Sequence, residues 1–174
     1  FYSSADLGFT AEYALNKNIS VDLSVFNGEG YKSHQHDEFL RPALGITVKD
    51  LGNFTARVYA DYMGKEVKQT SFAGFAAYTG KKFVAAAEYN YQWNTKMTDG
   101  QDLYGASVYT TWKPGEKIKY FARFDDLQSK PLEGQTTPWQ LAKDGQLLMG
   151  GLEFSPVKGI RISPNIRYWN PDEE

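Results

Sequence analysis

The chain has 174 residues, enough for one domain with a substantial core, and its formal net charge is -2. This near-neutral charge and a pI of about 5.8 give no reason to expect a nucleic acid partner. There is no cysteine, which excludes disulfides and thiolate metal sites, and no apolar run reaches the ~20 residues of a membrane-spanning helix. Aromatic residues make up 16% of the chain, which favours strands over helices.

Residues 83–94, FVAAAEYNYQWN, show the pattern that recurs along the chain. Alanine and aromatic side chains occupy the odd positions, whereas Glu88 and the amide side chains occupy even positions. Such period-2 alternation is typical of a strand with one apolar and one polar face. We expect about ten strands, at 4–15, 19–26, 39–48, 54–63, 71–79, 83–94, 103–112, 118–126, 146–154 and 160–169.

The run 71–79, SFAGFAAYT, is the exception, because both of its faces are small or apolar and its register stays open. The connections between the expected strands also follow a pattern. Short turns such as GKK and KPGEK follow the odd-numbered strands, whereas the segments after even-numbered strands are mostly longer and more polar. Outer-membrane barrels have short periplasmic turns and longer external loops, so this asymmetry favours an antiparallel, up-and-down transmembrane β-barrel.

All five arginines fall on the polar register of an expected strand, and so do the acids Asp6, Glu12, Asp22, Asp61, Glu88, Asp125 and Glu153. An Arg or Lys facing lipid at the bilayer midplane costs ~2–4 kcal/mol, so a barrel excludes charge from its outer face. A β-sandwich excludes charge from its core equally well, so both architectures stay open at this point. In a barrel, the charged side chains would line a wet interior. The predicted lining residues are Arg41, Arg57, Arg123, Arg161, Arg167, Asp6, Asp22, Asp61, Glu88, Asp125 and Glu153.

Aromatic residues concentrate near the ends of the expected strands, with mostly Ala, Val, Leu, Ile or Gly between them. Tyr and Trp favour the two interfaces of a bilayer, because the ring is apolar while its polar atom reaches water. A general preference of aromatic residues for strands would explain the same enrichment without a membrane. The placement at both ends favours the bilayer.

If the short turns are periplasmic, ten strands place both chain ends at the external face. Single-chain barrels of this class normally have both termini on the periplasmic side. We therefore expect residues 1–174 to form a single β-barrel domain that lacks flanking strands and belongs to a barrel of about twelve or more strands. Closure of these ten strands alone is the alternative.

Three stretches resemble a known family: VFNGEGY at 25–31, AAEYNY at 86–91 and GLEFSPVKGIRISPNIRYWNP at 151–171. They are similar to the C-terminal part of Gram-negative outer-membrane porins of the phosphate-selective-porin-like family. The resemblance implies passive diffusion of small hydrophilic or ionic solutes through a trimeric or monomeric channel. It also implies contact with the lipid bilayer and lipopolysaccharide. Phosphate selectivity is not expected, because the predicted lining carries about as many acids as bases.

Other functions find less support in the residues. His34 and His36 lie beside Asp37 and Glu38 and could bind a metal, but a solvated loop is the simpler interpretation, so we predict neither a metal nor a cofactor. Neither histidine lies on an expected strand, where it could serve as a catalytic base, so we expect no enzyme activity. Two alternatives stay open: a barrel that acts as a scaffold subunit in an outer-membrane complex, and a soluble ligand-binding β-barrel.

Overall fold

The computed structural model describes residues 7–28, 40–64 and 66–172 and shows an all-β fold of ten strands. The only helical segments among these residues are two single 3-10 turns, Thr95–Met97 and Leu141–Lys143. No helix in the described part of the chain is long and apolar enough to cross a bilayer. The strands are β1 (Gly8–Ala14), β2 (Ile19–Phe26), β3 (Arg41–Leu51), β4 (Phe54–Met63), β5 (Gln69–Thr79), β6 (Phe83–Trp93), β7 (Leu103–Trp112), β8 (Ile118–Ser129), β9 (Gly145–Phe154) and β10 (Asn165–Pro171).

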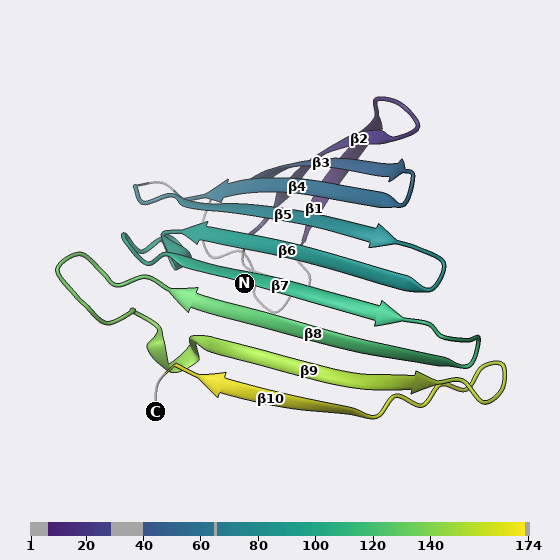
Figure 1. Ribbon diagram of the computed structural model, residues 1–174. Helices are drawn as coiled ribbons and strands as arrows, with labels where there is room; N and C mark the ends of the chain where they lie inside the picture. The colour runs from purple at the N-terminus through teal and green to yellow at the C-terminus, as the bar shows by residue number, and fades with distance from the viewer. Residues whose placement is uncertain (1–6, 29–39, 65, 173–174) are drawn as a thin grey trace.

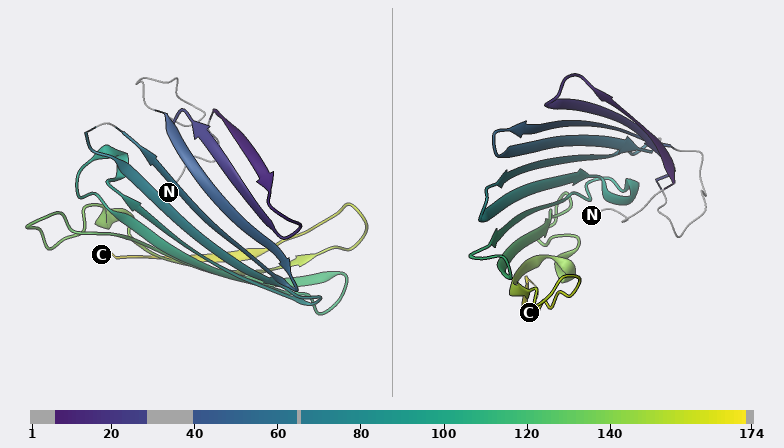
Figure 2. Two further views of the ribbon diagram at one scale, coloured as in Figure 1. Left: turned by 90° about the horizontal axis from the view of Figure 1, so that it is seen from above. Right: turned by 90° about the vertical axis from the view of Figure 1, so that its right-hand side faces the viewer.

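All ten strands belong to one antiparallel sheet in which each strand pairs with its neighbour in sequence, from β1 to β10 (Figure 1). The predicted up-and-down order and strand number are therefore confirmed. Within the described residues β1 and β10 do not pair with each other, so the sheet is open. Figure 2 shows that it curls into a trough, with β1 turned back toward the open side.

Strand boundaries agree closely with the alternation in the sequence. Predicted ranges 19–26, 54–63 and 103–112 coincide with β2, β4 and β7. β8 is longer than predicted, because its last residues continue the ladder by pairing with the start of β7: Leu127 lies opposite Gly105 and Ser129 opposite Leu103. The expected strand ends at residue 126, so the sequence predicts residues 127–129 to lie in the following connection.

The tenth strand begins later than predicted, at Asn165 instead of residue 160. Pro164 has no N–H to donate to the ladder, which explains why regular pairing starts only after it. An isolated bridge between Ile162 and Phe154 and a hydrogen bond from the Leu152 N–H to the Pro164 carbonyl continue the contact between the two segments. The expectation that Arg161 lies on a strand is therefore wrong, since it lies in the connection before this bridge.

Pairing also assigns the register of β5, which the sequence left open. Phe72 lies opposite Ala60 and Tyr91, on the apolar side of the sheet, whereas Ser71 lies opposite Asp61 and Gln92 on the polar side. Phe75 consequently shares the polar side with Glu88. Cross-strand neighbours decide a register that the small and apolar side chains of 71–79 cannot specify.

The connections sort by end, as predicted. Segments 52–53, 80–82 and 113–117 join strands at one end of the sheet, called here the short-turn end. Segments 94–102 and 130–144, which carry the two 3-10 turns, lie at the other, long-connection end (Figure 1). The connection 155–164 is the exception, because the late start of β10 lengthens it. The sheet therefore has two distinct rims, one at the short-turn end and one at the long-connection end.

The register of β5 can be tested with paired cysteines, since the chain contains none. Ala76 and Ala87 lie directly opposite each other, so the double variant Ala76→Cys with Ala87→Cys should be linked by a short bifunctional thiol reagent in detergent solution. The matched control, Ala76→Cys with Ala86→Cys, places the thiols on opposite faces and should give little product. Equal linking of both pairs, measured by mass spectrometry of the peptides, would contradict the register.

Candidate functional site

The two faces of the sheet differ sharply in composition, and the apolar face is the exposed one. Twenty large apolar side chains on this face are between 38% and 80% exposed. Soluble monomers rarely expose apolar patches beyond a few hundred Å², so a surface of this extent indicates an apolar partner. We call this surface the apolar face; its members include Phe9, Tyr13, Leu23, Val25, Leu44, Ile46, Phe54, Val58, Tyr62, Phe72, Phe83, Tyr89, Trp93, Val108, Trp112, Tyr120, Phe124, Leu148, Ile166 and Tyr168.

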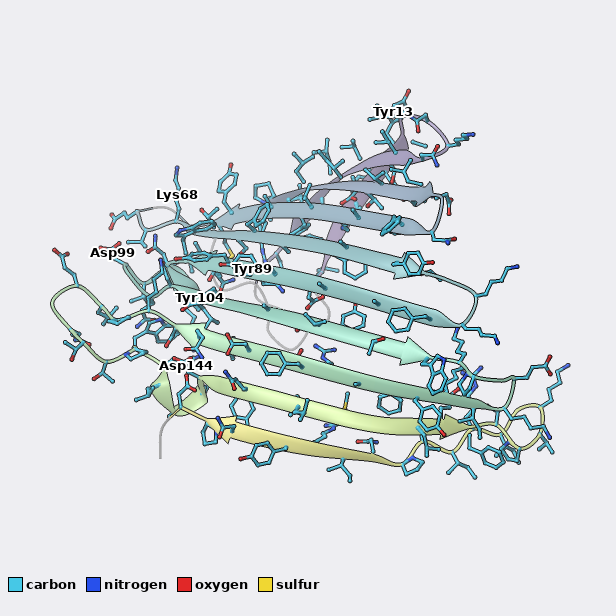
Figure 3. The ribbon with its side chains drawn as sticks, in the orientation of Figure 1. Tyr13, Lys68, Tyr89, Asp99, Tyr104 and Asp144 are labelled. Atoms are coloured by element: carbon cyan, nitrogen blue, oxygen red, sulfur yellow. The ribbon has the colours of Figure 1, made fainter. Side chains whose placement is uncertain are left out.

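The opposite surface, called here the inner face, holds polar side chains that are largely shielded. Asp22, Asp61, Ser71, Gln92 and Ser107 are all buried, and Ser71 is 0% exposed. In Figure 3 the convex side is turned to the viewer and carries Tyr13, Tyr89 and Tyr104, which belong to the apolar register. Polar groups inside the curve and apolar groups outside it reverse the arrangement of a soluble domain.

Aromatic pairs mark both rims of the apolar face. At the short-turn end the rings of Phe54 and Tyr78 are 5.2 Å apart, and those of Trp112 and Tyr120 are 5.7 Å apart. Tyr91, at the long-connection end, lies 4.2 Å from the Trp93 ring and 5.9 Å from the Tyr104 ring. Between these rims the face consists mainly of aliphatic and small residues, as in the sequence-based expectation.

The distance between the two rims matches a bilayer core. Strand β6 has 11 residues and carries an aromatic side chain at each end, Phe83 and Trp93. A rise of ~3.3 Å per residue gives roughly 33 Å along the strand, and a tilt of ~40° reduces this to about 25 Å of height. Transmembrane barrels have an apolar band about 25 Å tall. The rims are therefore spaced as two bilayer interfaces would require.

The inner face contains an ion pair that spans three strands. Arg57 on β4 donates to both carboxylate oxygens of Asp22 on β2, at 2.6 and 2.9 Å, and also to Thr47. Strand β3 lies between them, and its residue at this position is Gly45. A Cβ at Gly45 would lie 2.3 Å from Arg57 Nη2 and 2.5 Å from Asp22 Oδ2. The glycine leaves the space through which the two side chains meet.

Three further ion pairs lie on the same face. Arg41 contacts Asp61 at 2.6 Å, and both side chains are shielded, with 12% and 0% exposure. Lys119 contacts Glu153, its direct cross-strand neighbour, at 2.6 Å. Arg123 contacts Asp125 at 2.8 Å and lies 5.7 Å from the Tyr109 ring. The guanidinium groups thus hold carboxylates through charge-assisted hydrogen bonds.

The structure brings together most of the predicted lining residues. Arg41, Arg57, Asp22, Asp61, Arg123, Asp125 and Glu153 form the ion pairs just described. Glu88 and Arg167 lie on the inner face without an ion pair among the described residues. Arg161, although outside the strands, lies close enough to Glu153 to attract it. Asp6 falls outside the described residues, as do His34 and His36.

Sequence reasoning missed Lys119 as a lining residue. Lys119 has the parity of Arg123 and Asp125 on the same strand, and the pairing of β8 with β9 places it opposite Glu153. The inner face is not polar throughout. On β8 and β9 it also holds Leu127, Leu147 and Met149, which share the register of Asp125 and Glu153.

One acid occupies the apolar register. Asp126 lies opposite Ala106 and Gln146, on the side away from Asp125. Gln128 donates to Asp126 at 3.3 Å and to Asp172 at 2.8 Å, so polar groups gather at this corner of the face. The corner belongs to the long-connection end, where a bilayer would give way to water. The apolar band therefore ends before Asp126.

Asp102 joins two connections at the long-connection end. Its carboxylate accepts hydrogen bonds from the Tyr91 hydroxyl at 2.7 Å and the Asn94 N–H at 3.2 Å, and its backbone carbonyl accepts one from Trp139 Nε1 at 2.8 Å. Lys130 lies 4.9 Å from the Tyr91 ring. The pKa of Lys130 is raised, first by its contact with the Tyr91 hydroxyl and also by the charge of Asp102.

Asp144 directly precedes β9 at the same end of the sheet (Figure 3). Its side chain is 0% exposed and accepts a hydrogen bond from the Ser129 hydroxyl. Ser129 in turn accepts from the Gln140 N–H at 3.0 Å, which fixes the end of the 130–144 connection. No group of three His, Cys, Asp or Glu side chains in the described part of the chain could hold a metal ion. Through the hydrogen bonds described above, Asp102 and Asp144 tie the two long connections to the strands.

Comparisons of this chain with protein-family models, with curated proteins and with solved structures find no match. Functional interpretation consequently rests on the residues and their geometry.

The space above Gly45 can be tested by filling it. Gly45→Ala places a methyl group against Arg57 and Asp22, so the ion pair must shift and the free energy of unfolding should fall by about 1–3 kcal/mol. Gly74→Ala is the control, because its Cβ would meet only Phe72 ring atoms, at 3.8 and 4.0 Å. Equal stability of the two variants in denaturant titrations in detergent would show that the pair does not need this space.

Proposed function

We propose that this chain forms part of the wall of an outer-membrane channel of the porin type, through which small hydrophilic or ionic solutes diffuse. The observation that carries the proposal is the reversed polarity of the sheet: its apolar face is exposed and its charged face is shielded. Such a sheet needs hydrocarbon outside and water inside, which is the environment of a transmembrane β-barrel wall.

Two further features support a bilayer as the outer partner. Aromatic pairs border the apolar face at both ends, as expected at the two interfaces, where their polar atoms reach water. Unsatisfied backbone groups are costly in hydrocarbon, and in this sheet the ladder pairs every strand with its neighbour. Pairing of the edges of β1 and β10, with each other or with further strands, would complete a closed wall.

The inner face indicates how such a channel would select its solutes. Paired arginines and carboxylates give neighbouring positive and negative charges, so the wall is well hydrated without a large net charge. Solute choice would then depend on pore size and on the local field between the paired charges. The apolar residues of β8 and β9, such as Leu127 and Met149, give part of this wall a less polar surface.

The membrane assignment can be tested by adding one charge to either face. Val58→Arg places a cation on the apolar face and should cost ~2–4 kcal/mol at the bilayer midplane, which would impair assembly. Asn90→Arg is the control, because Asn90 lies on the inner face between the small residues Ala73 and Gly105. The readout is the yield of the heat-modifiable folded form on gels. Equal yields would argue against lipid at the apolar face, and recovery without detergent would indicate a soluble barrel.

Channel function is tested by planar-bilayer recording of the whole protein, where discrete current steps are expected. Arg123→Glu removes the partner of Asp125 and adds a second acid, so the cation-to-anion permeability ratio should rise. The protein must first show the wild-type gel shift, which separates selectivity from folding. Absence of current steps in the wild type would instead favour a structural barrel within an outer-membrane complex.

A further inference from the structure

Most charges on the inner face are neutralised by a neighbour. Four ion pairs join Arg57 to Asp22, Arg41 to Asp61, Lys119 to Glu153 and Arg123 to Asp125, at distances between 2.6 and 2.8 Å. A close pair of opposite charges has a field that falls off quickly with distance. These pairs therefore act on a solute in contact with them, whereas an ion that passes farther away experiences little net attraction from them.

Glu88 differs from these acids. It lies on β6 in the middle of the sheet, and its direct cross-strand neighbours are the uncharged Phe75 and Ser107. Within the described residues it has no ion pair, and it is half-buried. Asp125, on the next strand beyond Ser107, is already held by Arg123 at 2.8 Å. The carboxylate of Glu88 is thus an uncompensated negative charge at the centre of the inner face.

Among the described residues, no other charge of the inner face is paired with Glu88. Glu12 lies opposite Asp22 and adds to the attraction on Arg57, so it belongs to that cluster. Arg167 has no ion pair in the described part of the chain but lies on β10, four strands from Glu88. At ~4.8 Å per strand this separation is roughly 19 Å, well beyond the ~10 Å screening length at 0.1 M salt. By the same spacing Arg57 on β4 and Arg123 on β8 lie two strands from Glu88, at roughly 10 Å, and each is already held by its own carboxylate. Glu88 therefore keeps a negative charge that no cation of the described residues pairs.

We infer that Glu88 is a specificity-determining residue that raises the permeability of the channel for small cations relative to anions. This inference rests on the proposed function and deepens it, because it assigns the charge bias of the wall to one carboxylate. A charge of this kind acts on ions that pass within a screening length, and its effect weakens as salt increases.

The test is the reversal potential of the whole protein in a planar bilayer under a potassium chloride gradient. Glu88→Gln removes the charge with little change in shape, so the cation-to-anion permeability ratio should fall about twofold near 0.1 M salt and less at 1 M. Glu88→Asp keeps the charge and should keep most of the ratio, which a merely structural role would not predict.

A control separates the inner-face charge from net charge alone. Asp126→Asn changes the net charge equally but on the apolar register, and should leave the ratio unchanged. If the wild type conducts and Glu88→Gln has the same cation-to-anion permeability ratio, this inference is overturned while the proposed function stands. If the wild type gives no current steps, the proposed function is overturned as well.

Discussion

The exposed apolar face is the constraint on which the rest of the structure depends. One side of ten paired strands presents aromatic and aliphatic side chains outward over its whole width, and water is a poor solvent for such a surface. A second protein layer could cover it, but the described residues contain no further layer, only one sheet and two 3-10 turns. Hydrocarbon satisfies the same requirement, and the two aromatic rims are spaced as a bilayer would need.

The inner face follows from this arrangement. Once the apolar residues point outward, alternation turns the intervening Arg, Asp, Glu and Ser residues to the inside of the curve, where they shield one another. Arg suits such a surface better than Lys, because its planar fork holds a carboxylate through two hydrogen bonds, as Arg57 holds Asp22. Gly45 is part of the same solution, since the pair crosses the strand to which it belongs.

The alternation of apolar and polar residues predicts some strands of the sheet better than others. Alternation located β2, β4 and β7 to the residue, because each has one plainly apolar face. It located a strand at 71–79 but could not assign its register, because only the neighbours Asp61 and Gln92 show that Ser71 faces inward. The alternation of residues 160–169 continues through Pro164 and so predicts a strand that starts too early. The missing N–H of Pro164 explains why β10 begins only at Asn165.

The residue types of the candidate site could be predicted from the sequence, but the ion pairs between them could not. The arginines and acids of the polar register were identifiable by parity, but which of them pair depends on the alignment of strands far apart in the chain. The contact between Arg57 and Asp22 depends on the register of β2 with β3, on that of β3 with β4, and on Gly45 lying between the two side chains. The isolation of Glu88 likewise becomes visible only when Phe75 and Ser107 are known to be its neighbours.

The central claim, that the apolar face contacts hydrocarbon and the inner face contacts water, is tested most directly by a spin-label scan of β6 in lipid vesicles. Labels at successive residues from Phe83 to Trp93 report their accessibility to oxygen, which concentrates in the bilayer core, and to a water-soluble nickel complex. The account predicts that the two accessibilities alternate with period two and in opposite phase, with oxygen highest near Ala87 and Tyr89. Uniformly low oxygen accessibility along the strand, or alternation in the reverse phase, would contradict it.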